Sequence, residues 1–519
     1  MRAPLSFTYG NCLFGVDRTD AWAAFAIEVS SYQWLSEDAK RARFLALLGA
    51  LEAIEADVQI VRLGAGGGGG GRGAALAGAG AHGDAARAHV QAREAYAREH
   101  ERRVAELGDE CPALFVLVSL REPERDVASY VSSFAERGPR AWWSALLEAF
   151  SVHERGLLKG AELERARVGA DRAHARLAEF LPARPARGVE LQWLIRRAFC
   201  RGLGEPLIDG LHEPRALVFE RNGEAVLAPL EADVMRWTDS FVEHRGRCLR
   251  IESERGVSWQ AQLVLGALPE HTQFPGAAAE LMFAAPEALP FAVDLSLNAR
   301  FLPNELALRI ARKRIQDADQ IFRAESDGEQ GPSDLGYART QEARDLLAYL
   351  QASSRPPLLR ATLAIAVGAA DRTELERRVE GCRRAYGEIR LHRPLGDQLN
   401  LFLQHLPAQR TRVAGYDDTL TTEQVAAMMP TATHAVGSRD GFYLGYTLSG
   451  SRRPVWFNLR AGSDGDRNTA ILSVGALGSG KTTLDQKLKY EGFLLGARVI
   501  DCDPKGDHRF HLLEDVAPH

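Results

Sequence analysis

The stretch "AILSVGALGSGKTTLDQKLKYEGFLLGARVIDCDPKGDH" occupies residues 470–508 and contains the pattern G-x-x-x-x-G-K-T from Gly475 to Thr482. The apolar run 470–474 before the pattern predicts a buried parallel strand, and residues 482–495 have helical spacing. Strand, glycine-rich loop and helix follow in the order that a phosphate-binding loop requires, because the positive end of the helix dipole then faces the phosphate. The stretch therefore predicts a nucleotide-phosphate site; the alternative is a glycine-rich surface turn.

The residue types of this loop match the chemistry of phosphate binding. Successive N–H groups from Gly478 to Thr482 would form a nest for phosphate oxygens, and glycine avoids a Cβ that would obstruct the turn. Lys481 is expected to reach the β- and γ-phosphates, and Thr482 to ligate Mg²⁺. The predicted cofactors are thus ATP and Mg²⁺. The predicted binding residues are Gly475, Gly478, Ser479, Gly480, Lys481, Thr482 and Thr483, with Thr482 as the metal ligand.

A second strand is predicted at residues 497–501 ("ARVID"), directly before "DCDPKGDH". Acidic residues at the carboxyl end of a parallel strand lie beside the phosphate loop in a doubly wound sheet. Asp501 and Asp503 are therefore expected near Mg²⁺ and the γ-phosphate, and Asp503 joins Lys481 as a catalytic candidate. Lys505 is a candidate for contacting phosphate or a neighbouring subunit. An ordinary turn explains the same residues, since Pro, Gly and Asp all favour turns.

The cysteines and histidines of the chain match no standard metal or disulfide pattern. The spacing of Cys502, His508 and His511 differs from that of known zinc sites. The six cysteines are widely separated and include no C-x-x-C pair, which favours a reduced, cytosolic protein. No apolar signal core opens the sequence, and no stretch of about 18 apolar residues predicts a membrane span.

The length and the net charge of the chain limit the number of domains and the kinds of partner that can be expected. The chain has 519 residues, enough for two or three domains, and its formal net charge of −5 excludes a global basic field. Any DNA contact would have to be local. The basic run 312–314 (Arg312, Lys313 and Arg314) favours a solvated helix face over a nucleic-acid site.

Alternating strand and helix patterns predict an α/β and α+β multidomain chain with mixed sheets. A first module is expected at 1–205, with a flexible glycine-rich insertion at 64–83. Its strands are predicted at 12–16, 22–29, 57–63 and 113–120, and its helices at 38–56, 84–107, 141–150, 162–181 and 189–201.

A second mixed-sheet α+β module, of ferredoxin-like type, is expected at 206–410. Its predicted strands are 290–302, 358–369 and 388–394, and its predicted helices are 304–324, 341–350 and one capped by Asp371. The third predicted domain, 411–519, comprises a β-hairpin at 441–459 and the first part of a P-loop ATPase domain.

Five stretches together resemble a known family. They are "LFLQHLPAQ" (401–409), "AAMMPTATHAVGSRDGFYLGYTLSGSRRPVWFNL" (426–459), "SVGALGSGKTTLDQKL" (473–488), "GARVIDCDPKGDHRF" (496–510) and, more weakly, "YGNCLFGVDRTDAWAAFAIEVSSY" (9–32). The combination is similar to the conjugative-transfer ATPases of type IV secretion systems, the TraC-type or VirB-four motors.

The resemblance implies an N-terminal region that docks to secretion components at the inner membrane. It also implies a RecA-like P-loop NTPase domain that hydrolyses ATP as a hexamer, in the cytoplasm or at the inner-membrane face, to move a DNA or protein substrate. Gly475, Gly480, Lys481 and Thr482 would be its ATP and Mg²⁺ residues, and Asp503 and Lys505 would belong to the acidic turn after the second core strand.

One departure from this family limits the expected activity. Such motors have an apolar strand ending in Asp-Glu well beyond the loop, and a neighbouring subunit supplies an arginine. Neither has a counterpart here, and two strands do not make a stable sheet. We therefore expect a C-terminally truncated chain that is inactive as an ATPase on its own. The alternatives are a non-catalytic assembly module of the same apparatus and an unrelated P-loop kinase, against which the late position of the loop argues.

Overall fold

The computed structural model of the protein describes most of the chain. The described residues are 4–15, 20–64, 94–95, 98–99, 102, 112–121, 157–208, 210–221, 223–230, 233–234, 236–266, 274–326, 334–413, 415–438, 442–448, 453–458, 470–494, 498–506, 508 and 510. The predicted helix at 141–150 and nearly all of the insertion at 64–83 and of the helix at 84–107 lie outside them.

The chain divides into two compact units. Unit 1 comprises Met1–Ala65 and Pro112–Thr433, and unit 2 comprises Gly66–Cys111 and His434–His519. The boundary predicted between residues 205 and 206 lies inside unit 1. The predicted third domain, 411–519, corresponds best to the second segment of unit 2, which begins at His434.

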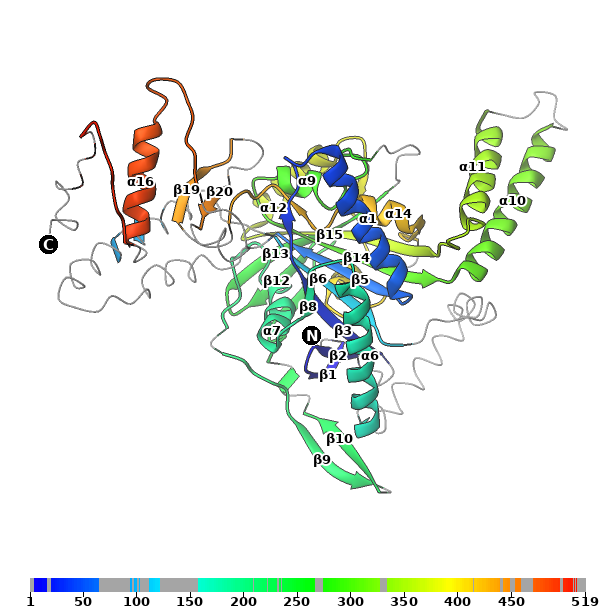
Figure 1. Cartoon of the computed structure of the whole chain (residues 1–519). Coiled ribbons are helices and arrows are strands. Elements are labelled where there is room, and N and C mark those ends of the chain that lie inside the picture. Colours follow the sequence, from blue (N-terminus) through cyan, green and yellow to red (C-terminus); the bar gives the residue numbers. More distant parts are fainter. Residues whose placement is uncertain are drawn as a thin grey trace. The chain divides into compact units, whose positions relative to one another are not determined.

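Unit 1 is built on one large antiparallel sheet with the strand order β1-β2-β3-β6-β5-β14-β15-β13-β12-β11 (Figure 1). Strands of both predicted N-terminal modules meet in it, because β5 of the first pairs with β14 of the second. β8, β16 and β17 pair with β3, β13 and β15. The bounds are β1 Leu5–Tyr9, β2 Cys12–Gly15, β3 Ala21–Ile27, β5 Val58–Leu63, β6 Ala113–Ser119, β8 Ala183–Pro185, β11 Phe241–His244, β12 Leu249–Ser253, β13 Gly256–Leu265, β14 Val293–Leu302, β15 Leu358–Ala369, β16 Leu391–His392 and β17 Asp418–Thr421.

Helices and three small sheets complete the fold. The helices are α1 Glu37–Ile54, α6 Gly160–Ala178, α7 Gly188–Arg197, α9 Ala284–Ala288, α10 Asn304–Ser326, α11 Asp334–Leu350, α12 Arg372–Tyr386, α13 Gln398–His405 and α14 Thr422–Ala427 in unit 1, and α16 Lys481–Leu494 in unit 2. The small sheets are β7-β10-β9 (Leu158–Lys159, Glu224–Pro229, Ala216–Arg221), β18-β4 (Ala432–Thr433, Ser30–Ser31) and, in unit 2, β19-β20 (Phe442–Tyr446, Pro454–Phe457).

Periodicity predicted most of these elements. The predicted strands that begin at 12, 22, 57, 113, 290 and 358 are confirmed as β2, β3, β5, β6, β14 and β15. Asp371 caps α12 as expected, accepting a 2.9 Å hydrogen bond from the Glu374 N–H. α11 begins at Asp334 rather than 341, because its first turn packs on α10: the rings of Phe322 and Tyr337 meet edge to face with centroids 4.9 Å apart.

One face of the main sheet carries a buried polar stripe. Successive side chains of a strand point to opposite faces, so Asp294, Ser296 and Asn298 of β14 share the face that bears Gln59 of β5. All four side chains are at most 2 % exposed. Buried polar groups require partners, and many of the partners of this stripe come from the chain segment that begins in the last turn of α13.

That segment, 404–412, crosses the polar stripe and is held by its amides. The Gln59 side chain donates to the carbonyls of Gln404 (3.3 Å) and Leu406 (3.0 Å), and the Asn298 amide donates to the carbonyl of Gln409 (2.7 Å). Ala408 adopts φ +60°, which lets the segment turn between these bonds. The motif "LFLQHLPAQ" therefore has a structural role in unit 1.

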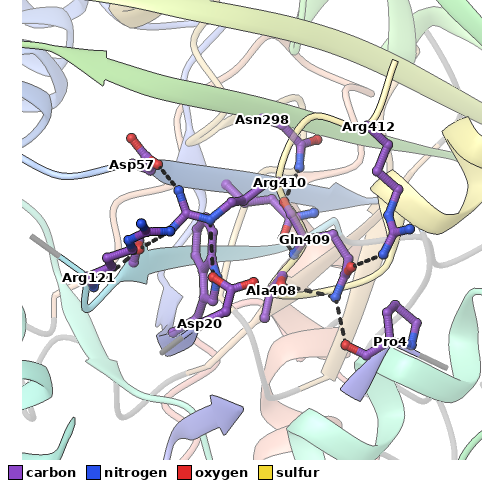
Figure 2. A network of polar contacts seen from close by, with 12 residues as sticks. Pro4, Asp20, Asp57, Arg121, Asn298, Ala408, Gln409, Arg410 and Arg412 are labelled. Carbon is purple, nitrogen blue, oxygen red and sulfur yellow. Dashed lines mark hydrogen bonds and ion pairs between the residues drawn. The ribbon is translucent and has the colours of Figure 1, made fainter. Parts of the chain in front are cut away.

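Arg410 connects the same segment to the other strands of the sheet, as Figure 2 shows. Its guanidinium donates to the carboxylates of Asp20 (3.1 Å) and Asp57 and to the Ser119 hydroxyl (3.0 Å), and it lies over the Trp22 ring. Three segments far apart in the sequence are thereby joined through one side chain.

Unit 2 contains the predicted hairpin, β19-β20, and helix α16. Tyr443 and Trp456 form an edge-to-face pair within the hairpin, with ring centroids 6.1 Å apart. The Lys487 ammonium of α16 lies 5.9 Å from the centroid of the Tyr443 ring, so the helix packs beside the hairpin.

Two predicted strands of unit 2 are wrong as strands. Residues 470–474 and 498–501 lie outside any strand, and Leu472, Val474 and Ile500 are 88 %, 83 % and 79 % exposed. A parallel strand forms only where neighbouring strands supply the ladder and helices cover both faces. No strand pairs with either segment within the described part of unit 2. Their apolar sequence is therefore left in contact with solvent.

Candidate phosphate-binding loop

The glycine-rich loop lies directly before α16, as its sequence predicted. Gly478 and Gly480 adopt φ angles of +77° and +86°, which residues with a Cβ rarely adopt. At Gly475 the backbone is ordinary, but a Cβ would lie 2.6 Å from the Ser479 hydroxyl oxygen. Glycine is therefore favoured at all three positions: at Gly478 and Gly480 by the positive φ angle, and at Gly475 by the close approach of the Ser479 side chain.

Lys481, the first residue of α16, folds back over the loop. Its ammonium donates to the carbonyl oxygens of Gly475 (2.8 Å) and Ala476 (2.7 Å). These acceptors are neutral and the contact is exposed to solvent. Because hydrogen bonds from an ammonium to an anion are stronger than those to a neutral carbonyl, a phosphate could replace both acceptors.

The loop also presents donors from the backbone. Ser479 N–H donates to the Ala476 carbonyl (3.2 Å) and Leu484 N–H to the Gly480 carbonyl (2.9 Å). Within the described part of unit 2, no backbone carbonyl accepts from the N–H groups of Gly480, Lys481 or Thr482. Free N–H groups at a helix N-terminus attract anions, so loop and helix together provide the donor set that a phosphate needs. The Thr482 and Thr483 side chains are exposed beside it.

The segment after residue 498 contacts α16 through a cluster of charged side chains. The Lys489 ammonium donates to Asp501 (2.7 Å) and to Asp485 (2.5 Å), and His508 Nδ1 lies 2.7 Å from Asp501 Oδ2. The hydrogen bond from Lys489 and then that with His508 hold the pKa of Asp501 below its usual value. Asp501 is therefore tied to the helix that follows the loop.

Asp503 organises a turn in the same segment. Its carboxylate accepts hydrogen bonds from the N–H groups of Lys505 (3.0 Å) and His508 (2.8 Å). The Lys505 side chain is exposed and Cys502 is an exposed free thiol, while His511 lies outside the described residues. No group of three or more metal-binding side chains occurs in the part of the chain that the structure describes. The catalytic role expected for Asp503 stays a prediction.

The sequence reasoning missed Lys489 of α16, whose ammonium donates to both Asp501 and Asp485, and it missed Asp485 itself. Their separation of four residues on a predicted helix is the usual signal for a side-chain pair. A further partner of Asp501, His508, was considered only as a metal ligand. It instead approaches three carboxylates, those of Asp501, Asp503 and Asp485, the last two at 3.8 and 3.6 Å.

A buried carboxyl lies further along the same helix. The Glu491 side chain is 1 % exposed; one oxygen accepts from the Lys487 ammonium at 2.5 Å, and the other has no partner among the described residues. Burial raises the pKa of Glu491 to about 8. Folded unit 2 therefore holds a proton on Glu491 that the unfolded chain loses above its ordinary pKa.

This proton makes the stability of α16 fall with rising pH. Between the ordinary pKa of 4.5 and about 8 the folded state binds more protons than the unfolded state, so the free energy of unfolding decreases as pH rises through this window. We expect the hydrogen-exchange protection factors of α16 amides, corrected for intrinsic exchange, to be lower at pH 8.5 than at pH 6. Glu491→Gln should remove most of this difference; an equal pH dependence in that variant would contradict the assignment.

Comparisons with known proteins do not identify the chain. No protein-family model matches it, and no curated protein matches it significantly.

Proposed function

We propose that the protein is an ATP-binding motor component of a conjugative or type IV secretion system. In the intact assembly, ATP hydrolysis would drive apparatus assembly or the transfer of DNA or protein. The observation that carries the nucleotide part of the proposal is the contact of Lys481 with the carbonyls of Gly475 and Ala476 across a loop with free N–H groups. The secretion part rests on the resemblance of five sequence stretches.

The residues of the loop are of the types that bind Mg-ATP. Lys481 would leave the loop carbonyls for the β- and γ-phosphate oxygens, and the N–H groups of Gly480 to Thr482 would donate to the same phosphates. The Thr482 hydroxyl would be the protein ligand of Mg²⁺. The metal would neutralise phosphate charge, while the chain positions the phosphates and provides fixed donors.

The cellular setting of the proposal follows from the same resemblance. The RecA-like core would assemble as a hexamer, and unit 1 would dock to secretion components at the inner-membrane face from the cytoplasm. Within the described residues, no helix is both long and apolar enough to cross a bilayer. Attachment at the membrane would then occur through partner proteins.

Paired substitutions of Thr482 test the metal-binding part of the site. We expect Thr482→Val, which removes the hydroxyl but keeps the shape, to weaken binding of Mg-ATP about tenfold or more, because a Mg²⁺ ligand is lost. Thr482→Ser retains the hydroxyl and should bind Mg-ATP as the wild type does. Titration of a fluorescent ATP analogue with and without Mg²⁺ measures both. Equal binding by the two variants would contradict the role of Thr482.

Hydrolysis separates the motor from the alternative function, a non-catalytic assembly module of the same apparatus. Phosphate release that depends on Lys481 would support the motor, whereas Mg-ATP binding without turnover, in the presence of the secretion components, would support the assembly module. A protein that binds no nucleotide at all would contradict both readings of the loop.

A further inference from the structure

Helix α10 projects from the main sheet of unit 1 together with α11. It begins two residues after β14, and its first turns are buried: Leu306, Ala307 and Ala311 pack with Leu302, Leu350 and Leu358. Beyond Ala311 its described side chains are exposed or partly exposed. Figure 1 shows the two helices as a hairpin that extends beyond the ends of β14 and β15.

The outer face of α10 is basic over most of its length. At about 100° per residue, Arg309, Arg312 and Lys313 share the face roughly opposite the buried Ala307 and Ala311. The same face continues along the helix for about 21 Å, at 1.5 Å per residue. We call it the basic face of α10; its residues are Arg309, Arg312, Lys313, Gln316, Gln320 and Arg323, all exposed.

Glu305, in the first turn of α10, lies on this side of the helix one turn before Arg309. From Arg309 to Arg323 no acidic side chain lies on the basic face. Asp317 and Asp319 lie on its flanks, and Asp319 approaches Arg344 of α11 (3.9 Å) instead. Arg309 and Lys313 are four residues apart, a spacing at which like charges destabilise a helix. Glu305 and Asp317 stand four residues before Arg309 and four residues after Lys313, but within the described residues neither carboxylate forms an ion pair with these cations. An external anion would remove this repulsion.

Arg314 belongs to a different side of the helix. Although it follows Arg312 and Lys313 directly in sequence, it lies about 90° or more around the helix from them. The sequence run 312–314 is therefore not one patch. The continuous stripe becomes apparent only when the helix direction and its buried face are known.

We propose that the basic face of α10 binds the phosphate backbone of a double-stranded nucleic acid. Three of its four cations are arginines, whose planar guanidinium contacts phosphate oxygens in pairs, and the two glutamines are donors that commonly contact phosphates. The face carries no aromatic side chain on which single-stranded bases could stack. It also offers no apolar side chains to insert into a lipid surface, because all six of its residues are charged or polar.

Binding of this kind is independent of base sequence and strongly dependent on salt. Neutralising up to four phosphates gives a slope of log affinity against log salt of about −3 to −4. The nucleotide site is not required for this contact, so its failure would leave the proposed function of the glycine-rich loop unchanged, and the reverse also holds.

The test compares two charge-matched triple variants of the full chain. In the first, Arg309, Arg312 and Lys313 are each replaced by glutamine; in the second, glutamine replaces Arg377, Arg383 and Arg384 of α12, which are also exposed. Fluorescence anisotropy with a labelled 20-base-pair duplex at about 50 mM salt measures affinity. We expect the first triple variant to bind the duplex at least tenfold more weakly than the wild type. Its slope of log affinity against log salt should be less steep by about three, and the second triple variant should differ little from the wild type.

A further double variant tests the same face while leaving all of its cations in place. Gln316→Glu with Gln320→Glu keeps helix-forming residues but introduces two negative charges on the basic face, and it should weaken duplex binding in the same direction. Equal loss in both triples, or no measurable duplex binding by the wild type, would overturn the proposal. So would loss of binding to anionic phosphatidylserine vesicles in the first triple while duplex affinity stays unchanged, since that result assigns the face to a membrane.

Discussion

Lys481→Ala should reduce the affinity of the protein for Mg-ATP by about 10- to 100-fold, the equivalent of losing charge-assisted hydrogen bonds to phosphate. Among the described residues, the lysine ammonium donates only to exposed loop atoms, the carbonyls of Gly475 and Ala476 and the Ser479 hydroxyl. Its removal therefore leaves the packing of unit 2 intact. Any Mg-ATP hydrolysis by the assembled protein should be lost in parallel, because the same ammonium would stabilise charge on the transferred phosphate.

Lys505→Ala is the matched control for this substitution. Lys505 is an exposed lysine of the same unit, and its recorded contact with Asp503 uses the backbone N–H, which alanine retains. Isothermal titration with Mg-ATP should separate the two variants clearly. If Lys481→Ala bound as tightly as Lys505→Ala, the glycine-rich loop would be an ordinary surface turn, and the proposed nucleotide site would have to be abandoned.

Asp294→Ala should destabilise unit 1 by about 3–5 kcal/mol, a large part of the stability of a typical domain. Asp294 is 1 % exposed and accepts from Arg201 at 2.7 Å, with Arg197 at 3.6 Å; both arginine side chains are 4 % exposed. Without the carboxylate, two buried guanidinium groups lose their counter-charge. Burial already lowers the pKa of Arg201, and Asp294 is the main group that opposes this shift.

Unfolding in guanidinium chloride, followed by tryptophan fluorescence, measures this decrease in the free energy of unfolding. The signal reports on unit 1, because Trp22, Trp193 and Trp237 all belong to it. Adding Arg201→Met to Asp294→Ala should restore part of the stability, because one unpaired charge is removed with its partner. The control is Glu243→Ala, which breaks the surface pair with Arg245, whose side chain is 55 % exposed, and should cost less than about 1 kcal/mol. Similar losses in Asp294→Ala and in this control would show that the buried charges are compensated elsewhere.

The buried polar stripe that includes Asp294 could not be predicted from the sequence. β14 was predicted as a strand from its composition, but its Asp, Ser and Asn side chains resemble the solvent face of an ordinary antiparallel strand. Asp294 accepts from the buried Arg201, and Ser296 donates to Asn298. Asn298 in turn is buried under the segment 404–412, where the carbonyls of Gln404 and Gln409 accept its hydrogen bonds. These two carbonyls lie more than a hundred residues away, so no local pattern could indicate them.

The glycine-rich loop is the opposite case, since its donors lie within eight consecutive residues. Glycines, lysine and the start of the helix could all be placed from the motif, and α16 begins at Lys481 as the motif requires. The two flanking strands could not be placed in this way. Their apolar residues satisfy a strand pattern, but a strand needs at least one neighbouring strand to pair with, and residues 470–474 have none within the described chain.

Local patterns were enough to predict several elements of this protein: strands such as β3, β5 and β14, the longer helices, the Asp371 cap and the glycine-rich loop before α16. Each depends on interactions between residues at most a few positions apart, which periodicity and turn chemistry record directly. Long-range packing was needed to show that β5 and β14 join the two N-terminal halves in one sheet, and that the face of α10 with Arg309, Arg312 and Lys313 is left exposed. Those features depend on which long-range pairings bury the most surface and satisfy the most backbone groups, and that choice involves the whole chain at once.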